Sequence, residues 1–385
     1  MDFNLTDDQQ GIVNLARELA QKEFKRNAAR WDQNAEYPHE NVEKLVEMGF
    51  CGMTIPKRYG GQGRPIIDAI LVVEEVAKAC GITGRIIVET NMGAIGAIMA
   101  YGTEEQKRRY ASHVLKGDKP CIAVSEPDAG TAATTMKTRA ILDGNKYIVN
   151  GIKHWITGGG ISFTNLVFAR IIQNGEDRGI GGLLIDKGTH GFNFGKIENA
   201  MGLRGIPERE LIFEDCIVPK ENLLVLEDGF KKLMSAYNGQ RVGAATVALG
   251  IASGAYELAV EYSKVRRQFG RPICEFQGLM WMLADMRIQL DAARMLIYRA
   301  ATTHESSFPR LMETSIAKAF SADVALKVTN DALQMFGASG YSKDLPLERM
   351  VRDARMFKIG GGTSEAQRNM VAQGILRRKF DWRKI

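Results

Sequence analysis

The sequence predicts a mainly helical α+β protein, with helices in the first and last parts of the chain and a β-rich region between them. Three observations carry this prediction: capping motifs near the N-terminus, short β-branched segments in the middle, and long helical runs after residue 226. A chain of 385 residues exceeds the usual size of one domain. We therefore expect three domains, at residues 1–118, 119–226 and 227–385.

Two motifs in the first region predict where helices begin. Thr6-Asp7-Asp8-Gln9 and Thr103-Glu104-Glu105-Gln106 both fit a capping box, in which the Thr hydroxyl and the Gln side chain each bind a free backbone amide. Apolar residues follow the first box at helical spacing. This region is therefore predicted to be all-helical.

The middle region changes to short β-branched or aromatic segments that Gly, Asn and Asp turns separate. This pattern predicts a small β-domain of sandwich or barrel type. Its strands are expected around residues 146–149, 166–169, 182–185 and 210–213.

Long helical runs follow residue 226, and short connections join them. Such runs predict an antiparallel four-helix bundle. Its helices are expected at residues 228–266, 276–305, 308–337 and 361–379.

Composition excludes several classes of protein. Charged residues make up 25% and apolar ones 45%, which is ordinary for a globular enzyme. The net charge of +6 suits an anionic ligand, but the basic residues are dispersed, so no nucleic-acid partner is expected. The first residues are acidic and stretches such as Ile66 to Val73 are too short to cross a bilayer. We expect a cytoplasmic protein without a membrane partner.

Cysteines and histidines give no sign of a disulfide framework or a metal centre. The five cysteines, at positions 51, 80, 121, 216 and 274, are far apart and lack Cys-x-x-Cys spacing. The five histidines do not cluster with them. The cysteines are predicted to be reduced core thiols, and no metal is expected.

One loop and one tryptophan are candidate ligand contacts. Small residues around Gly130 would let the backbone approach a ring system, and the hydroxyls of Ser125 and Thr131 could bond its heteroatoms or an amide. The simpler interpretation of this loop is a plain turn. Trp155 is open to the simpler interpretation of a core aromatic.

Two further segments have chemistry suited to anions. Arg267 offers a planar donor fork for phosphate, unless it is one cation of a solvated helix end. Gly360-Gly361-Gly362 precedes an apolar helix, which suggests a helix N-terminus open to an anionic or acceptor group. Thr363 and Gln367 would then lie one turn apart on one face.

Arg85 is the most unusual cation. The apolar run after Gly84 predicts that a helix begins there, so Arg85 would oppose the positive end of the helix dipole. An anionic substrate tail would explain this placement, and so would an ion pair with Glu89 four residues later. Both explanations stay open.

The order and spacing of four motifs resemble the acyl-CoA dehydrogenase family over essentially the whole chain. By the resemblance, the chain has that family's fold, binds FAD and an acyl-CoA thioester, and forms a homotetramer. The motifs are residues 123–131, 153–158, 266–271, and 334–341 followed by Arg352-Asp353. The implied cofactor contacts are Ile122, Val124, Ser125, Gly130, Thr131, Trp155, Thr157, Arg267, Phe269, Gln277, Gln334, Gly337 and Ala338.

The chain departs from the family at the base that abstracts the α-proton. Gly361 stands where the family often has Glu, and the other position used for this base, on the first bundle helix, holds Gln240. An amide cannot accept a proton near neutral pH. By the same resemblance, Asn238 and Arg241 contact coenzyme A. The simpler interpretation of Gln240 is a polar residue on an exposed helical face.

A missing base together with Arg85 resembles one branch of the family, the 3-sulfinopropionyl-CoA desulfinases. The segments at 234–244, 275–282 and 352–357 are similar to that branch, as is the loop with Ala132 where most dehydrogenases have Asp. The resemblance implies that Arg85 holds a sulfinate, that Arg85 and Gln240 serve catalysis, and that Thr131, Asn238 and Arg241 bind the thioester. The implied reaction yields propionyl-CoA and sulfite.

Two other functions are compatible with the sequence. One is a dehydrogenase or reductase acting on a short acidic acyl-CoA, for which an electron-transfer flavoprotein would be a partner. The other is a flavin-bearing protein of the DNA-damage-response type, although no concentrated basic face is evident.

Overall fold

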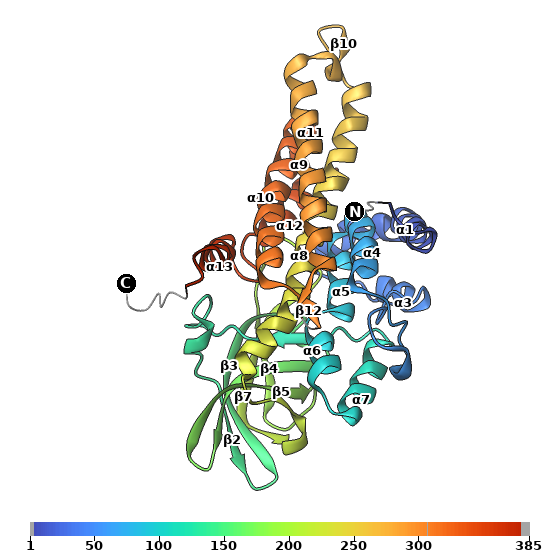
Figure 1. Ribbon diagram of the computed structural model, residues 1–385. Helices are drawn as coiled ribbons and strands as arrows, with labels where there is room; N and C mark the ends of the chain where they lie inside the picture. The colour runs from blue at the N-terminus through green and yellow to red at the C-terminus, as the bar shows by residue number, and fades with distance from the viewer. Residues whose placement is uncertain (1–3, 306, 379–385) are drawn as a thin grey trace.

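A computed structural model describes residues 4–305 and 307–378, apart from the side chain of residue 305. The order of helices and strands follows the predicted α, β, α sequence (Figure 1). The bundle rises away from the β-domain, and the N-terminal helices pack beside the junction between the two. The predicted fold class is confirmed.

The N-terminal region is all-helical, as predicted. Both capping boxes are present, since Thr6 and Gln9 bind each other's backbone amides and Thr103 and Gln106 do the same. A π-helical stretch, Ala20–Phe24, joins the first two helices. The helices are α1 (Asp7–Leu19), α2 (Lys25–Asn34), α3 (His39–Glu47), α4 (Ile66–Ala79), α5 (Gly81–Asn91), α6 (Ala94–Tyr101) and α7 (Glu104–Val114).

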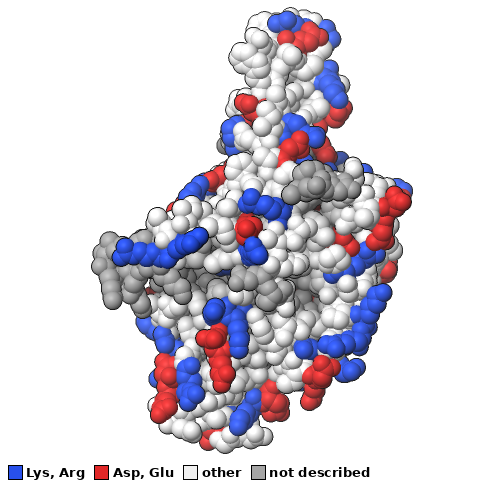
Figure 2. Space-filling model, viewed as in Figure 1, with Lys and Arg blue, Asp and Glu red and all other residues white. Residues whose placement is uncertain are grey.

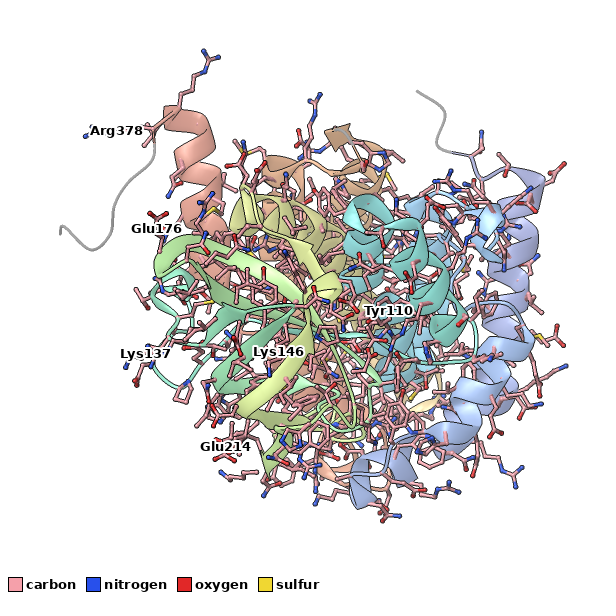
Figure 3. All side chains as sticks on the ribbon, turned by 90° about the horizontal axis from the view of Figure 1, so that it is seen from below. Tyr110, Lys137, Lys146, Glu176, Glu214 and Arg378 are labelled. Carbon is pink, nitrogen blue, oxygen red and sulfur yellow. The ribbon has the colours of Figure 1, made fainter. Side chains whose placement is uncertain are left out.

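The β-domain is one eight-stranded sheet in the order β6-β7-β3-β2-β4-β5-β8, with β1 beside β4. Each of the four predicted segments lies in a strand. Charged side chains such as Lys137, Glu176 and Glu214 lie at the outer rim of this domain (Figure 3). The strands are β1 (Cys121–Ala123), β2 (Arg139–Asp143), β3 (Lys146–Thr157), β4 (Thr164–Gln173), β5 (Glu176–Asp186), β6 (Phe192–Ile197), β7 (Glu208–Pro219) and β8 (Leu223–Val225).

The C-terminal region contains the four expected long helices and two more. The additional helices, the short α11 and α12, cover a stretch for which no helix was predicted, and the last expected helix starts at Ser364 instead of residue 361. Residues 379–385 of the predicted C-terminal domain lie outside the described residues. The elements are α8 (Gly229–Val265), β9 (Arg267–Gln268), β10 (Arg271–Pro272), α9 (Gln277–Thr302), β11 (His304–Glu305), β12 (Phe308–Pro309), α10 (Leu311–Phe336), α11 (Ala338–Tyr341), α12 (Leu347–Met356) and α13 (Ser364–Leu376).

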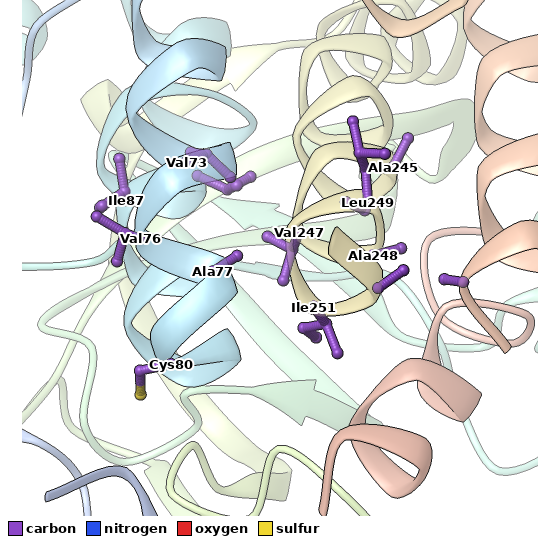
Figure 4. Close-up of a cluster of buried hydrophobic side chains, with 14 of the residues drawn as sticks. Val73, Val76, Ala77, Cys80, Ile87, Ala245, Val247, Ala248, Leu249 and Ile251 are labelled. Carbon is purple, nitrogen blue, oxygen red and sulfur yellow. The ribbon is translucent and has the colours of Figure 1, made fainter. Parts of the chain in front are cut away.

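The main core joins the N-terminal helices to the bundle. Apolar side chains of α4 and α5 interdigitate with those of α8 (Figure 4). Small residues allow the close approach, because a Cβ on Gly84 would lie 2.8 Å from Ala77 Cβ and one on Gly243 would lie 2.4 Å from a Val88 methyl. This contact fixes the rotation of α5, and with it the direction in which its polar residues point.

Helix α8 is the one described helix that is long and apolar enough to span a membrane. Its most apolar stretch is 83% buried inside the protein, so its composition is that of a core helix. On the visible face of the molecule, acidic and basic side chains are interspersed, without a broad patch of one sign (Figure 2).

Candidate active site

Helix α5 presents Arg85 from its second turn. The helix begins at Gly81, so the prediction that Arg85 opposes the positive helix end is wrong. The N-cap residue, Cys80, has an extended backbone and its side chain makes no capping hydrogen bond. The sequence therefore contains no capping motif that would mark the beginning of α5. Arg85 Nε donates to Glu89 Oε1 at 2.9 Å, which confirms the predicted pair.

The pair with Glu89 leaves part of the Arg85 guanidinium free. Arg85 is 5% exposed, and its buried Nη1 has no hydrogen-bond partner. Burial disfavours the charged guanidinium, but the charge and the hydrogen bond of Glu89, together with weaker effects of Tyr237 and Glu208, outweigh burial and raise the pKa of Arg85. A buried, permanently charged group with an unused donor is a ready binding point for an anion.

The first helix of the bundle brings Gln240 to the same region. A Cβ added at Gly93, just after α5, would lie 2.5 Å from Gln240 Oε1 and 3.1 Å from Ile122 Cδ1. Gln240 is 5% exposed and its Oε1 has no partner, so it is not on an exposed helical face. Its amide is available for a ligand, and it cannot act as a base at neutral pH.

Arg241 ties α8 to the glycine loop before α13. Its Nε donates to the Gly361 carbonyl at 3.2 Å, and its Nη1 donates to Asn238 Oδ1 at 2.9 Å. Asn238 in turn donates to the Pro309 carbonyl at 3.0 Å. Burial lowers the pKa of Arg241, but the guanidinium stays charged at physiological pH.

Gly361 leaves space where a side chain would project. Its φ is +73°, and the one atom within 4 Å of an added Cβ, neighbours in sequence aside, is Lys318 Cε at 4.0 Å. Lys318 Nζ donates to the Gly362 carbonyl at 2.5 Å. Burial, together with the charges of Arg241 and Arg85, lowers the pKa of Lys318 to about 7. Sequence reasoning missed this buried lysine.

Thr363 and Gln367 hold the same glycine loop. The Thr363 hydroxyl accepts a hydrogen bond from Ala366 N, so it caps α13. The buried Gln367 amide donates to the carbonyls of Gly361 and Gly362, both at 3.5 Å. Its Oε1 has no partner and remains available to a ligand.

A β-bulge in β3 turns Trp155 outward. The register with β7 shifts between Lys153 and Ile156, and Trp155 has a φ of +59°, which is rare for a bulky residue. Its side chain is among the exposed large hydrophobics, at 53%, so the core-aromatic alternative is wrong. An exposed indole side chain on a strand suits stacking against a planar ring.

The loop after β1 is fixed beside Trp155 by a buried acid that sequence reasoning missed. Glu126 accepts hydrogen bonds from Lys153 Nζ at 2.8 Å and Thr138 N at 3.0 Å. The Ser125 carbonyl accepts from His154 N at 2.8 Å. Gly130 and Thr131 are exposed, and a Cβ on Gly130 would meet nothing within 4 Å. These contacts hold the start of the loop, at Val124 and Ser125, against the strand residues that precede Trp155.

Glu208 stands opposite Thr157 where β7 begins and β3 ends. The Thr157 hydroxyl donates to both carboxylate oxygens, at 2.8 and 3.0 Å. Burial raises the pKa of Glu208 to about 7, against the lowering effects of this hydrogen bond and of Arg85. No sequence motif predicted a role for Glu208, because the residues that act on its carboxyl belong mainly to α5 and β3, which are distant in sequence.

The remaining predicted cofactor residues lie at the far end of the bundle. From Arg241 to Val265, 24 residues of α8 at about 1.5 Å each extend about 36 Å. Tyr262 stacks on Phe336 with ring centroids 4.0 Å apart, which places the end of α10 beside the end of α8. Arg267, Phe269, Gln277, Gln334, Gly337 and Ala338 belong to this end, and Phe269 is 93% exposed (Figure 1). One chain does not bring them to Trp155.

The structure has a cleft next to the site and a larger one elsewhere. A cleft of about 300 Å³ is lined by Met92, Gly93, Ala236, Gly239 and Phe308, among others, and so lies next to the residue that precedes Gln240 in α8. A larger cleft of about 1020 Å³ lies away from Arg85, between α2, the end of α4 and α12. Within the described residues no group of His, Cys, Asp and Glu is arranged to hold a metal, and the five cysteines are unpaired.

Family comparisons cover each part of this architecture. The model described as "Acyl-CoA dehydrogenase, N-terminal domain" matches residues 6–118, the middle-domain model matches 121–216, and the C-terminal-domain model matches 227–376. These matches define an enzyme scaffold made of a helical domain, a β-domain and a helical bundle in this order. The chain belongs to the acyl-CoA dehydrogenase family.

Individual relatives are similar over their full length. A protein from Cupriavidus necator named 3-sulfinopropanoyl-CoA desulfinase is 55% identical over 98% of this chain and 97% of its own length. The structure of butyryl-CoA dehydrogenase from Megasphaera elsdenii has a TM-score of 0.93 and 38% identity, covering 98% of this chain and 100% of that one. A glutaryl-CoA dehydrogenase from Mycobacterium smegmatis in complex with FADH2 has a TM-score of 0.92 and 25% identity, covering 98% and 97%.

Proposed function

We propose that the chain is an FAD-containing desulfinase that converts 3-sulfinopropionyl-CoA and water to propionyl-CoA and sulfite. One observation carries the proposal: buried Arg85 keeps an unpartnered Nη1 in a site whose two expected base positions hold Gly361 and Gln240. The similarity to proteins named 3-sulfinopropanoyl-CoA desulfinase supports the same substrate.

Arg85 would bind the sulfinate, and the surrounding charges favour this role. Arg241 and Lys318 lie close enough for their charges to interact, and Arg85 also acts on Lys318. Three neighbouring cationic side chains repel one another unless an anion binds among them. A sulfinate that receives two parallel donors from a guanidinium is also oriented, which a single point charge does not achieve.

The thioester would lie along α8. Asn238, Arg241 and Thr131 are the proposed contacts to the coenzyme A portion, and a cleft lined by Ala236 and Gly239 lies along the same part of α8. Gln240 could donate to the thioester carbonyl or orient a water, since it can both donate and accept hydrogen bonds. Loss of sulfinate requires no removal of the α-proton, so an amide at this position prevents desaturation without blocking the proposed reaction.

FAD fits the β-domain face and would supply a planar polar surface without net redox change. The exposed indole of Trp155, the open space at Gly130 and the Thr157 hydroxyl suit an isoalloxazine ring. Ile122, Val124, Ser125 and Thr131 border this face. The proposed contacts at the distal end are Arg267, Phe269, Gln277, Gln334, Gly337 and Ala338.

A homotetramer is part of the proposal, and the separation of these two groups of residues supports contact between at least two copies. A second copy would bring its distal end to the β-domain face of the first, which would also cover the exposed Phe269. The domain boundaries near residues 118 and 226, and a cytoplasmic location, belong to the same proposal.

A dehydrogenase or reductase of a short acidic acyl-CoA is the second candidate, with an electron-transfer flavoprotein as its partner. Burial raises the pKa of Glu208 to about 7, and this favours the second candidate because a carboxyl with such a pKa can take up a proton near neutral pH. A duplex-binding flavoprotein finds no support in the interspersed charges of the visible face.

The deciding experiment gives the purified protein 3-sulfinopropionyl-CoA and follows sulfite together with the flavin absorbance. Sulfite release without bleaching is expected. Bleaching by butyryl-CoA or glutaryl-CoA, without sulfite release from the sulfinate substrate, would assign the chain to the second candidate.

A further inference from the structure

We propose that Glu208 is the base that takes a proton from the water attacking the sulfinate. The inference rests on the proposed desulfinase function and names a group that the resemblance did not assign.

The strand register fixes where the carboxyl lies. Glu208 and Thr157 are partners across β7 and β3, and the Thr157 hydroxyl divides its donation between the two oxygens at 2.8 and 3.0 Å. One hydroxyl proton cannot satisfy both oxygens of a carboxylate, which together offer about four acceptor positions. Glu208 is half-buried at the start of β7, within reach of the charges of Arg85 and Glu89 on α5. The carboxylate therefore keeps acceptor capacity for a water molecule.

Neighbouring acids do not offer the same capacity. Glu89 Oε1 accepts from Arg85 at 2.9 Å, and Glu89 Oε2 pairs with Lys119 Nζ at 2.6 Å. Both of its oxygens are thus committed to buried cations. Glu208 forms no ion pair within the described part of the chain, while the charge of Arg85 still reaches it. Glu208 is therefore the carboxyl near Arg85 that can exchange a proton without breaking an ion pair.

Several charged groups face Glu208 and set its proton affinity. Arg85 and Glu89 act from α5, Lys119 acts from the segment before β1, and Thr157 acts from β3. Burial exceeds the stabilising effects of the two cations and of the hydrogen bond, and the pKa of Glu208 rises to about 7. A general base works best when its pKa lies near the working pH.

The proposed step balances without an oxidant. Water forms a bond to sulfur and gives one proton to the Glu208 carboxylate, while the carbon–sulfur bond breaks and its electron pair stays with carbon. That carbon takes up one proton, which Lys318 or a second water can supply. The products are propionyl-CoA and hydrogen sulfite, and Glu208 returns its proton to solvent. The step is a hydrolysis: a sulfur–oxygen bond and a carbon–hydrogen bond replace the carbon–sulfur bond. No external oxidant or reductant is needed.

The test compares Glu208→Gln with the wild type and with Glu214→Gln, which makes the same change at an exposed position of the same strand. We expect Glu208→Gln to lower kcat by about 100-fold or more, with little change in KM and with flavin retained. Wild-type kcat should rise with pH through an inflection, and the variant should lose that rise. Glu214→Gln should keep both.

Other outcomes separate this inference from the proposed function. Wild-type sulfite release with an unchanged pH profile in Glu208→Gln would overturn the role of Glu208 and leave the desulfinase proposal standing. A raised KM with unchanged kcat would overturn it too, since Glu208 would then act through Arg85 as a counter-charge. Absence of sulfite release from the wild type would overturn both. If Glu208→Gln does not fold, Glu208→Asp must keep the pH dependence, and loss of that dependence would contradict the proposal.

Discussion

Arg85 and Glu89 lie one turn apart on α5, and the Nε of the arginine donates to Oε1 of the glutamate at 2.9 Å. This side-on contact uses one edge of the guanidinium and leaves Nη1 without a partner. Lys119 holds the other oxygen of Glu89 at 2.6 Å, so the carboxylate cannot rotate to cover the free edge. The two alternatives for Arg85 in the sequence are therefore compatible: the ion pair fixes the guanidinium for a ligand.

Replacement of Arg85 by lysine should remove most activity while leaving the flavin bound. An ammonium keeps the charge but cannot present two parallel donors to a sulfinate, and it cannot reach Glu89 and the ligand at the same time. We expect a loss of roughly 100-fold in sulfite release, as for other misplaced orienting groups. Sulfite assays and flavin absorbance measure the two effects.

The matched control for this variant is Arg108→Lys, an arginine on α7 that is largely exposed. It should behave as the wild type. Unchanged turnover in Arg85→Lys would remove Arg85 from the mechanism.

Glu89→Gln should destabilise the folded protein. The substitution leaves Arg85 and Lys119, which are 5% and 1% exposed, without their shared counter-charge. Removal of one member of a buried ion pair costs about 3–5 kcal/mol. Chemical denaturation of the variant and of the exposed control Glu47→Gln measures the difference. A cost below about 1 kcal/mol would show that the two cations do not depend on Glu89.

Local motifs in the sequence predicted much of the fold. The capping boxes at Thr6 and Thr103 were confirmed because they consist of contacts three residues apart. The start of α5 was missed because Cys80 supplies no cap, and α12 was missed although it is strongly amphipathic, since the sequence around it was interpreted as part of a motif.

The site itself depends on contacts that periodicity does not encode. Trp155 faces outward because of a bulge, and a register shift in a strand leaves no simple signal in sequence. Glu208 and Lys318 acquire perturbed pKa values from neighbours on other elements. One local pattern indicated that Lys318 is buried: it lies between two small residues, Ala317 and Ala319, which are themselves buried on α10.

Gln240→Glu should introduce the chemistry that the wild-type site lacks. The position lies on a regular helix, so the change avoids the strained φ that a glutamate at Gly361 would have to adopt. A carboxylate there restores a base near the thioester, and it also repels an anionic substrate tail. We expect butyryl-CoA to bleach the flavin in this variant and sulfite release to fall.

Anaerobic absorbance spectra of the variant and the wild type with butyryl-CoA provide the measurement. Gln373→Glu, a change of the same kind on α13 outside the site, is the control and should not bleach. A variant that releases sulfite at the wild-type rate would exclude charge repulsion at this position.

Lys318→Met should alter the pH dependence of stability. The pKa of Lys318 is about 7 in the folded protein and about 10.5 in the unfolded chain. Between these values the unfolded state binds more protons than the native state, so the lysine makes stability rise with pH across this window.

Methionine at position 318 has a similar length and no charge, but it loses the hydrogen bond to the Gly362 carbonyl. The stability of Lys318→Met relative to the wild type should therefore be greater at pH about 7 than at pH about 9. The difference should be a few kcal/mol at most, since each unit of pKa difference corresponds to about 1.4 kcal/mol. Urea titrations at both pH values measure this change. Lys327→Met, on the exposed face of the same helix, should show little dependence on pH across the window, and an equally flat result for Lys318→Met would mean that Lys318 keeps its ordinary proton affinity in the folded protein.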